Sequence, residues 1–154
     1  MQITDKLAKL VSEALDSTQS SGSLPVGGDV EIKIERPTRA EHGDFSTSLP
    51  LALARTMRLA PMQIAEAIAA AIPDHHMVGA VTHAAPGFVN FTLSTEWLQS
   101  QIDVVRSAGD TFGSVDVGVG KSVQVEFVSV NPTGPLHVGH ARGAVIGSSL
   151  ANVL

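Results

Sequence analysis

The sequence predicts an α+β protein with a small antiparallel sheet covered by helices, followed by a strand-turn-helix segment. Three observations support this fold class. Apolar residues recur at helical spacing near the start of the chain, they alternate with polar residues in short runs farther along, and a Pro/Gly-rich turn precedes a last helix. The 154 residues are enough for a hydrophobic core, because a domain of about 150 residues buries roughly 68–70% of the surface that its unfolded chain exposes.

The first half of the chain predicts three helices and one strand. Residues 3–18 carry apolar side chains at 3.6-residue spacing and predict the first helix. After a Ser/Gly/Pro-rich loop, residues 30–35 alternate between apolar and charged side chains, which predicts a half-buried strand. Two further helices are expected over the Leu- and Ala-rich segment 49–57 and over 61–71, which begins at a proline and stops just before another.

The second half predicts two more strands and two helices. The apolar runs 77–82 and 88–93 are separated by HAAPG, which suits an antiparallel connection, so the three strands form one sheet. A helix is expected to start at residues 94–97, with an apolar face farther along it. Beyond a glycine-rich stretch come a strand over 123–128, the turn NPTGPL and the start of the final helix.

These patterns predict two domains joined by a linker. We expect an α+β domain over residues 1–110, a Gly-rich linker over 111–121, and the opening of a second domain over 122–154. The short polar run His42, Gly43 and Asp44 within the first domain is expected to be a structural turn, with Asp44 capping the following helix.

Composition excludes several classes of protein. The chain has no cysteine, which rules out disulfides, cysteine-based zinc sites, iron–sulfur clusters and a thiol nucleophile. No apolar run approaches the ~18 residues that a membrane-spanning helix needs, so we expect a cytoplasmic protein without membrane contact. The formal net charge of -5 argues against broad, sequence-independent binding of nucleic acid, but it leaves room for a local basic patch.

The final strand-turn-helix segment has the order in which open α/β sheets build ligand sites. Backbone N–H groups at the helix start, near Pro135 and Gly139, carry partial positive charge and can receive a phosphate chain. His137 and His140 share a face, so their imidazoles can donate hydrogen bonds to phosphate oxygens. Two histidines at this spacing are also common as ordinary surface or core residues. No cysteine or nearby acidic residue supplies further ligands, so we expect no metal site.

These residues resemble a known family. The tetrapeptide at 137–140, HVGH, resembles the HIGH signature of class I aminoacyl-tRNA synthetases, and its context, FVSVNPTGPLHVGHARGAVIG, is similar to that of arginyl-tRNA synthetases. Two upstream runs, ERPTRAEHGDFSTSLPLALAR and APGFVNFTL, resemble the amino-terminal appended domain of the same family. The resemblance covers most of residues 30–154 and implies an ATP-dependent arginine-tRNA ligase. It also implies that residues 122–154 begin a Rossmann-type catalytic domain with its nucleotide-binding motif.

The resemblance implies roles for residues of the final segment. Arginine would attack the α-phosphate of ATP, and a ribose hydroxyl of tRNA would then attack the adenylate. The catalytic residues would be His137 and His140, and the ATP-binding residues Pro135, His137, Gly139 and His140. ATP would bring its own Mg²⁺. The arginine-binding residues would be Glu126, Ser129 and Asn131, where a carboxylate pairs with a cationic amino acid. Without the resemblance, Glu126 is better explained as a surface acid at a strand end.

The resemblance also implies a tRNA contact by the appended domain. Phe88 and Asn90 match positions that contact an unpaired base of the tRNA D-loop in this family. Strand alternation places both on one face, where the ring can stack on a base while the amide reads its edge. The alternative for Phe88 is a core aromatic. Four arginines form the local basic cluster of an acidic chain and either contact tRNA phosphates or form a solvated face; they are Arg36, Arg39, Arg55 and Arg58.

The chain lacks parts that the resemblance would lead one to expect. A KMSK-like loop for the ATP phosphates and a helical anticodon-binding region have no counterpart in the 154 residues. We therefore expect an amino-terminal part of an arginyl-tRNA synthetase that is monomeric and inactive in aminoacylation on its own. Two alternatives are a stand-alone tRNA-binding module and a small nucleotidyltransferase that uses the histidine turn by itself.

Overall fold

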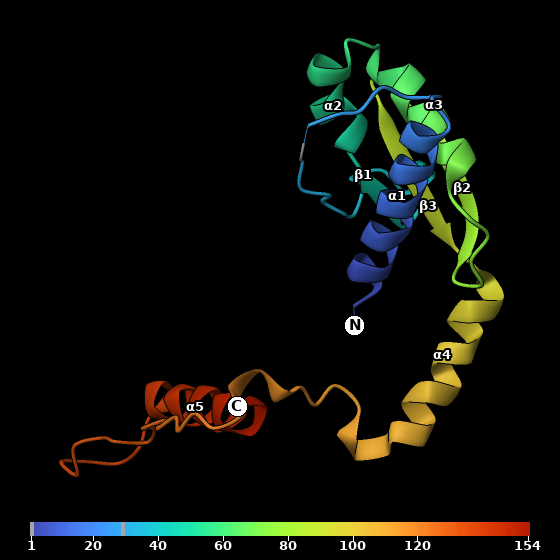
Figure 1. The fold of residues 1–154 in the computed structure, drawn as a ribbon. Coiled ribbons are helices and arrows are strands. Elements are labelled where there is room, and N and C mark those ends of the chain that lie inside the picture. Colours follow the sequence, from blue (N-terminus) through green and yellow to red (C-terminus); the bar gives the residue numbers. More distant parts are fainter. Residues whose placement is uncertain (1, 29) are drawn as a thin grey trace. The chain divides into compact units, whose positions relative to one another are not determined.

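The computed structural model describes residues 2–28 and 30–154, which divide into two compact units, 1–108 and 109–154. Within the described residues, the first unit contains four α-helices and a three-stranded antiparallel sheet, and the second contains one α-helix (Figure 1). The predicted α+β class with a small antiparallel sheet is therefore confirmed. None of the helices among the described residues is long and apolar enough to cross a membrane.

Three helices of the first unit form where apolar periodicity and prolines predict them. They are α1 (Ile3–Ser20), α2 (Leu49–Met57) and α3 (Pro61–Ala71). Leu7, Val11 and Ala14 of α1 are fully buried, as expected for one stripe of an amphipathic helix. α3 starts at a proline, whose missing N–H costs nothing in the first turn of a helix.

The sheet has the order β1-β3-β2, with β1 (Phe45–Thr47), β2 (Val78–Ala84) and β3 (Phe88–Leu93) all antiparallel to their neighbours. β2 and β3 form the predicted hairpin, with Ala84 opposite Phe88. The central strand β3 therefore forms hydrogen bonds on both edges, which fixes its register firmly.

The prediction of a strand over residues 30–35 was wrong. Residues 30–35 form no strand; the segment meets the sheet only through an isolated bridge between Glu35 and Ser46. Its apolar side chains do pack against the core. The alternation in the sequence therefore predicted correctly which side chains are buried, but not whether the backbone pairs with a neighbouring strand. The third strand is instead β1, which the sequence did not predict.

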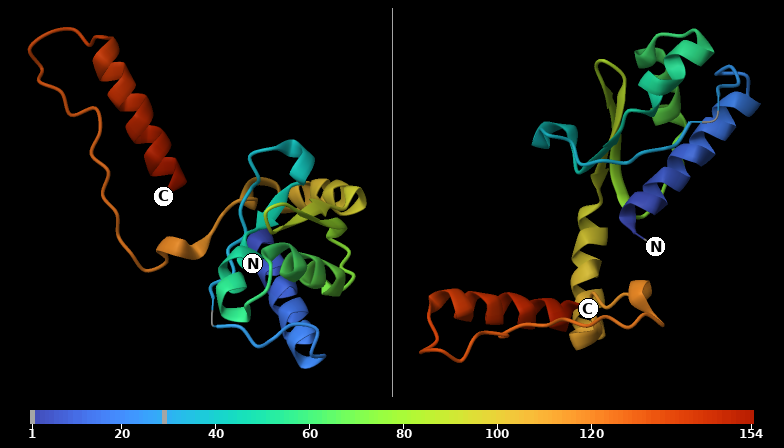
Figure 2. Two further views of the ribbon diagram at one scale, coloured as in Figure 1. Left: turned by 90° about the horizontal axis from the view of Figure 1, so that it is seen from above. Right: turned by 90° about the vertical axis from the view of Figure 1, so that its left-hand side faces the viewer.

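The helices pack on one face of the sheet. α3 contacts β2 and β3, α2 contacts β3, and α1 packs on α3 (right-hand view of Figure 2). Val89, Phe91 and Leu93 of β3 enter this core, with 0%, 0% and 8% of their surface exposed. The residues between them lie on the opposite face, which none of the described α-helices covers. The first unit thus presents one face of its sheet to the surroundings.

The last helix of the first unit, α4 (Thr95–Ala108), continues from the end of β3 and runs away from the sheet (Figure 2). It starts as predicted, with the backbone N–H of Trp97 donating to Ser94 Oγ at 3.3 Å. Only Trp97 of this helix packs partly against the core. The expected apolar face, Leu98, Ile102 and Val105, is exposed.

The second unit consists of turns, an extended segment and α5 (Val138–Val153). The predicted strand over 123–128 was wrong, because these residues form no ladder among the described residues. A strand needs a neighbour to receive its N–H and C=O groups, and this unit offers none. Val128 also has a φ of 61°, which interrupts extended geometry. Phe127 nevertheless packs against Gly147 of α5, where a Cβ would overlap its ring.

Candidate functional site

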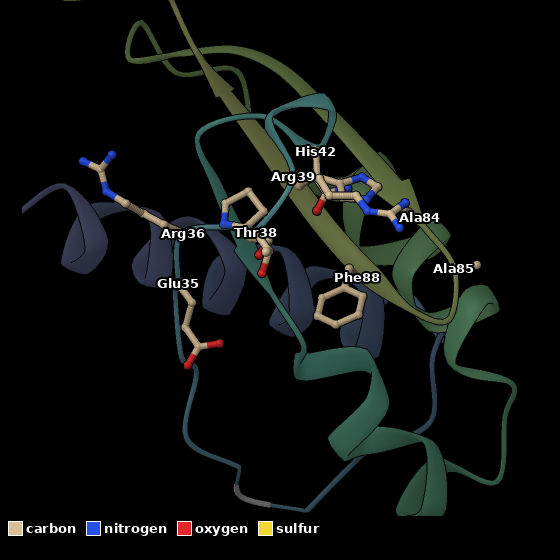
Figure 3. Close-up of a pocket in the computed structure, with 11 residues that line it drawn as sticks. Glu35, Arg36, Thr38, Arg39, His42, Ala84, Ala85 and Phe88 are labelled. Carbon is tan, nitrogen blue, oxygen red and sulfur yellow. The ribbon is translucent and has the colours of Figure 1, made fainter.

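A hollow of about 360 Å³ opens on the helix-free face of the sheet (Figure 3). The first residues of β3 form its floor, the end of β2 forms one side, and the segment before β1 forms the rim. Its lining residues are Glu35, Arg36, Pro37, Thr38, Arg39, His42, Ser46, Ala84, Ala85, Phe88 and Asn90. Both residues expected to contact RNA, Phe88 and Asn90, therefore lie in one cavity.

Phe88 and Asn90 share this face because they are two positions apart in a strand. Asn90 lies directly opposite Ser46 of β1 and Thr82 of β2. Only 4% of its surface is exposed, whereas Phe88 is half-buried. A half-buried ring offers a stacking surface, and an amide beside it offers both a donor and an acceptor. The pair can thus hold and read a flat heterocycle.

The rim, residues 36–42, is held on β3 by Gly43 and Asp44. Asp44 accepts a hydrogen bond from the backbone N–H of Leu93 at 2.8 Å, and its own N–H donates to the carbonyl of Phe91 at 2.8 Å. The sequence predicted that Asp44 caps the following helix, and this prediction was wrong, because its carboxylate is engaged by β3. It instead ties the rim to a strand 49 positions away, a contact that local sequence patterns do not encode.

Gly43 makes this close approach possible. Its φ of 81° and ψ of -159° lie in a region that is essentially restricted to glycine. A Cβ at this position would lie 2.6 Å from the carbonyl oxygen of Phe91. The structural turn predicted for His42, Gly43 and Asp44 is confirmed, with His42 ending a short 3₁₀ turn, Ala40–His42.

The basic cluster predicted from the sequence separates into two pairs. Arg36 and Arg39 line the hollow, whereas Arg55 and Arg58 of the α2 region do not. The guanidinium of Arg36 lies 5.3 Å from the centre of the Phe45 ring, and Arg39 is paired with Glu41 at 3.4 Å. Sequence reasoning missed the lining residues Thr38, His42 and Ser46, because only the fold brings them to β3.

A second hollow, of about 500 Å³, lies within the 109–154 unit at the start of α5. It brings together five of the residues assigned to ATP and arginine, namely Ser129, Asn131, Pro135, His137 and His140. Glu126 and Gly139 line a neighbouring hollow of about 530 Å³, which Ser129 and His140 also line. The seven residues thus lie around two adjoining hollows rather than in one.

The rings of His137 and His140 are stacked at the N-terminus of α5, with ring centres 3.6 Å apart and planes at 26°. Nδ1 of His137 accepts from the backbone N–H of Gly139 at 3.1 Å, and Nδ1 of His140 accepts from the N–H of His137 at 3.4 Å. A neutral imidazole that accepts at Nδ1 carries its proton on Nε2. In that tautomer the Nε2–H of each ring can donate to a ligand. Among the described residues, this site included, no three His, Asp or Glu side chains gather as metal ligands would.

The sequence matches a family model described as the arginyl tRNA synthetase N terminal domain over residues 5–93, more than half of the chain. An arginine–tRNA ligase of Dehalococcoides mccartyi (strain CBDB1) is 41% identical over 154 residues, which is 100% of this chain and 28% of that protein. A ligase of the same name from Thioalkalivibrio sulfidiphilus is 43% identical over 150 residues, or 97% of this chain and 26% of the ligase. The chain thus spans little more than a quarter of these relatives.

Two solved structures share the fold. The arginyl-tRNA synthetase of Thermus thermophilus matches with a TM-score of 0.54 and 28% identity, covering 97% of this chain and 23% of that one. The arginyl-tRNA synthetase of Plasmodium falciparum matches with a TM-score of 0.62 over 96% of this chain and 27% of that one. At 14% identity, the second match concerns the fold alone.

Proposed function

This chain belongs to the arginyl-tRNA synthetase N-terminal domain family, and we propose that it forms the RNA-contacting part, together with the beginning of the nucleotide-binding part, of an arginine–tRNA ligase. The observation that supports this most directly is the hollow that holds Phe88 and Asn90 on a sheet face without helices. Single-stranded RNA is commonly recognised in this way, by an aromatic ring that stacks on an unpaired base and a polar group that reads its edge. The proposed ligand is an unpaired base of the D-loop of arginine tRNA.

The hollow suits one base rather than a duplex. Its floor is one ring and one amide, and the small side chains of Ser46, Ala84 and Ala85 leave room above them. Asn90 is almost fully buried, so a base bound against it is shielded from water. A buried amide favours the base that satisfies its donor and acceptor and penalises bases that leave one of them unpaired.

We propose that residues 122–154 begin a Rossmann-type domain that binds ATP and arginine. The turn and the first residues of α5 supply Pro135, Gly139 and two Nε2–H donors from His137 and His140. These donors would hold phosphate oxygens and stabilise the negative charge that develops when the arginine carboxylate attacks the α-phosphate. Mg²⁺ would arrive with ATP.

The same proposal assigns the arginine site to Glu126, Ser129 and Asn131. The Glu126 carboxylate would pair with a cationic group of the amino acid, and the hydroxyl and amide would orient it. Ser129 and Asn131 line the hollow of the histidines, whereas Glu126 lines the adjoining one. Arginine would therefore lie across the two hollows, with its carboxylate toward the histidines.

A titration of the chain with arginine tRNA, followed by filter binding, tests the RNA contact. Phe88→Ala should weaken binding roughly 5- to 150-fold, because stacking on an aromatic ring contributes about 1–3 kcal/mol per base. Asn90→Ala should weaken tRNA binding as well, and it should reduce the preference for the natural D-loop base over other bases at that position of the tRNA. Thr92→Ala is the matched control, since Thr92 is exposed on the same strand face but does not line the hollow. Equal binding by wild type and Phe88→Ala would refute the proposed contact.

A further inference from the structure

A compact group of three charged or polar side chains lies on the rim of the hollow, around the 3₁₀ turn Ala40–His42. Nη1 of Arg39 lies 3.4 Å from Oε1 of Glu41, and Nε2 of His42 lies 3.9 Å from the same oxygen. Oε1 of Glu41 thus lies near both nitrogens, and the Arg39 nitrogen donates a hydrogen bond to it. All three side chains are accessible, with exposed fractions of 74% for Arg39, 67% for Glu41 and 36% for His42.

The three residues differ in their relation to the hollow. Arg39 and His42 line it, whereas Glu41 is not among the lining residues. The guanidinium of Arg39 and the imidazole of His42 therefore border the space where a base would lie, and the Glu41 carboxylate pairs with Arg39 from outside that space. A phosphate oxygen and a carboxylate oxygen make the same demands on a guanidinium, namely short charge-assisted hydrogen bonds from its N–H groups.

The other charged lining residues are directed elsewhere. In Figure 3 the side chains of Glu35 and Arg36 extend away from the Phe88 ring, while Arg39 and His42 lie on the side of Ala84. Arg36 is also engaged by the Phe45 ring, 5.3 Å from its guanidinium carbon. Among the described residues, the one ion-pair partner of Arg39 is thus the solvent-exposed carboxylate of Glu41.

We propose that Arg39 and His42 bind the phosphate group adjoining the base in the hollow, and that Glu41 occupies this phosphate site in the RNA-free protein and is displaced on binding. The proposal rests on the RNA contact proposed above. It adds a backbone subsite to a base subsite and makes Glu41 a competitor for that subsite. Binding would exchange one exposed ion pair for a contact between Arg39 and a phosphate, with release of counterions from the RNA.

The exchange is favourable for two reasons. An ion pair between exposed side chains contributes little, because water and salt screen it and both side chains lose freedom. A phosphate that is already positioned by its stacked base meets Arg39 at a high effective concentration, so this second contact costs little additional entropy. The rim itself is fixed to β3 by Asp44, so Arg39 is presented close to the base site before RNA binds.

The test measures the affinity for arginine tRNA as a function of salt concentration. Arg39→Ala should lower the slope of log K against log salt by about 0.7–0.9 and weaken binding about five- to eightfold at 0.1 M salt, since that slope is the contribution of one phosphate contact. Glu41→Gln should tighten binding about 1.5- to fivefold, which corresponds to the release of one exposed ion pair. The gain should vanish when Glu41→Gln is added to Arg39→Ala.

A matched control separates the local effect from net charge. Glu31 and Lys33 form a comparable exposed pair at 3.5 Å, and neither lines the hollow. Glu31→Gln changes the net charge by the same amount as Glu41→Gln and should leave the affinity unchanged. All these positions are exposed, so equal thermal midpoints are expected, and they verify that the variants are folded.

The outcomes distinguish this proposal from the one on which it rests. Weaker binding by Phe88→Ala together with an unchanged salt slope for Arg39→Ala would overturn the phosphate site and leave the base site standing. A Glu41→Gln variant that binds no more tightly than Glu31→Gln would overturn the competition. If Phe88→Ala binds like wild type, the base site itself fails, and the phosphate subsite fails with it.

Discussion

Replacing Gly43 by alanine should destabilise the first unit strongly, because two separate costs coincide there. The backbone lies at φ 81° and ψ -159°, and holding a residue with a side chain in that region costs on the order of 1–3 kcal/mol. The added Cβ would also lie 2.6 Å from the carbonyl oxygen of Phe91, which belongs to the central strand and cannot move aside cheaply. Overpacking of this kind costs about 1–3 kcal/mol, so the free energy of unfolding should fall by about 2–6 kcal/mol.

Gly22→Ala is the control for the conformational cost alone. Gly22 also has a positive φ, 77°, but, its two chain neighbours aside, no described atom lies within 4 Å of the position of its Cβ. We expect a loss of about 1–2 kcal/mol for this variant. Urea unfolding followed by circular dichroism measures both losses on the full chain. If Gly43→Ala is no more destabilising than Gly22→Ala, the close approach of the rim to β3 does not constrain this position.

Three further predictions concern stability. Asp44→Ala should cost about 1–3 kcal/mol because a backbone N–H of β3 loses its acceptor, and Asp44→Asn, which keeps an oxygen, should recover most of that loss in urea unfolding. Ile64→Ala, at a fully buried position, should cost about 2–5 kcal/mol, whereas Ile102→Ala, at a position 60% exposed, should change the midpoint little. Burial lowers the pKa of His75, whose Nδ1 accepts from the N–H of Met77, so the folded state disfavours the protonated ring. The contribution of the neutral ring to the free energy of unfolding should be complete above about pH 6.5, the pKa in the unfolded chain, and should be lost as the pH falls below that value. His75→Gln should remove this pH dependence in thermal melts at several pH values.

The helices could be predicted from the sequence because their signals are local. Periodic apolar residues and a proline at the first position fix α1 and α3 without reference to the rest of the chain. β3 was predictable from a local signal as well, since it is an apolar run that follows the turn sequence HAAPG. β1 has only three residues and all are buried, so it shows no alternation that could reveal it.

Pairing was less predictable than burial. Segment 30–35 alternates like a strand and packs against the core, but its backbone meets the sheet at Glu35 alone. Segment 123–128 has strand composition and no neighbouring strand within its unit. In both cases the sequence specifies which side chains are apolar, whereas a ladder also requires a partner backbone, which the segment itself does not encode.

In the candidate sites, too, local patterns could be predicted and long-range contacts could not. Phe88 and Asn90 could be placed on one face by alternation, and His137 and His140 on one helix turn by their spacing. The rim could not be placed, because Asp44 and Leu93 are joined across 49 positions. His42 was interpreted as part of a turn for the same reason, although it lines the hollow as well.

Successive side chains of β3 point to opposite faces of the sheet, and this affects how the sequence of the domain can evolve. Val89, Phe91 and Leu93 face the helices, while Phe88 and Asn90 face the hollow. Selection for folding and selection for ligand preference therefore act on different residues of one short segment. A library that randomises the half-buried position 88 should yield many folded variants with altered preferences, whereas one that randomises 89, 91 and 93 should yield few folded proteins. The domain can acquire a new partner without rebuilding its interior.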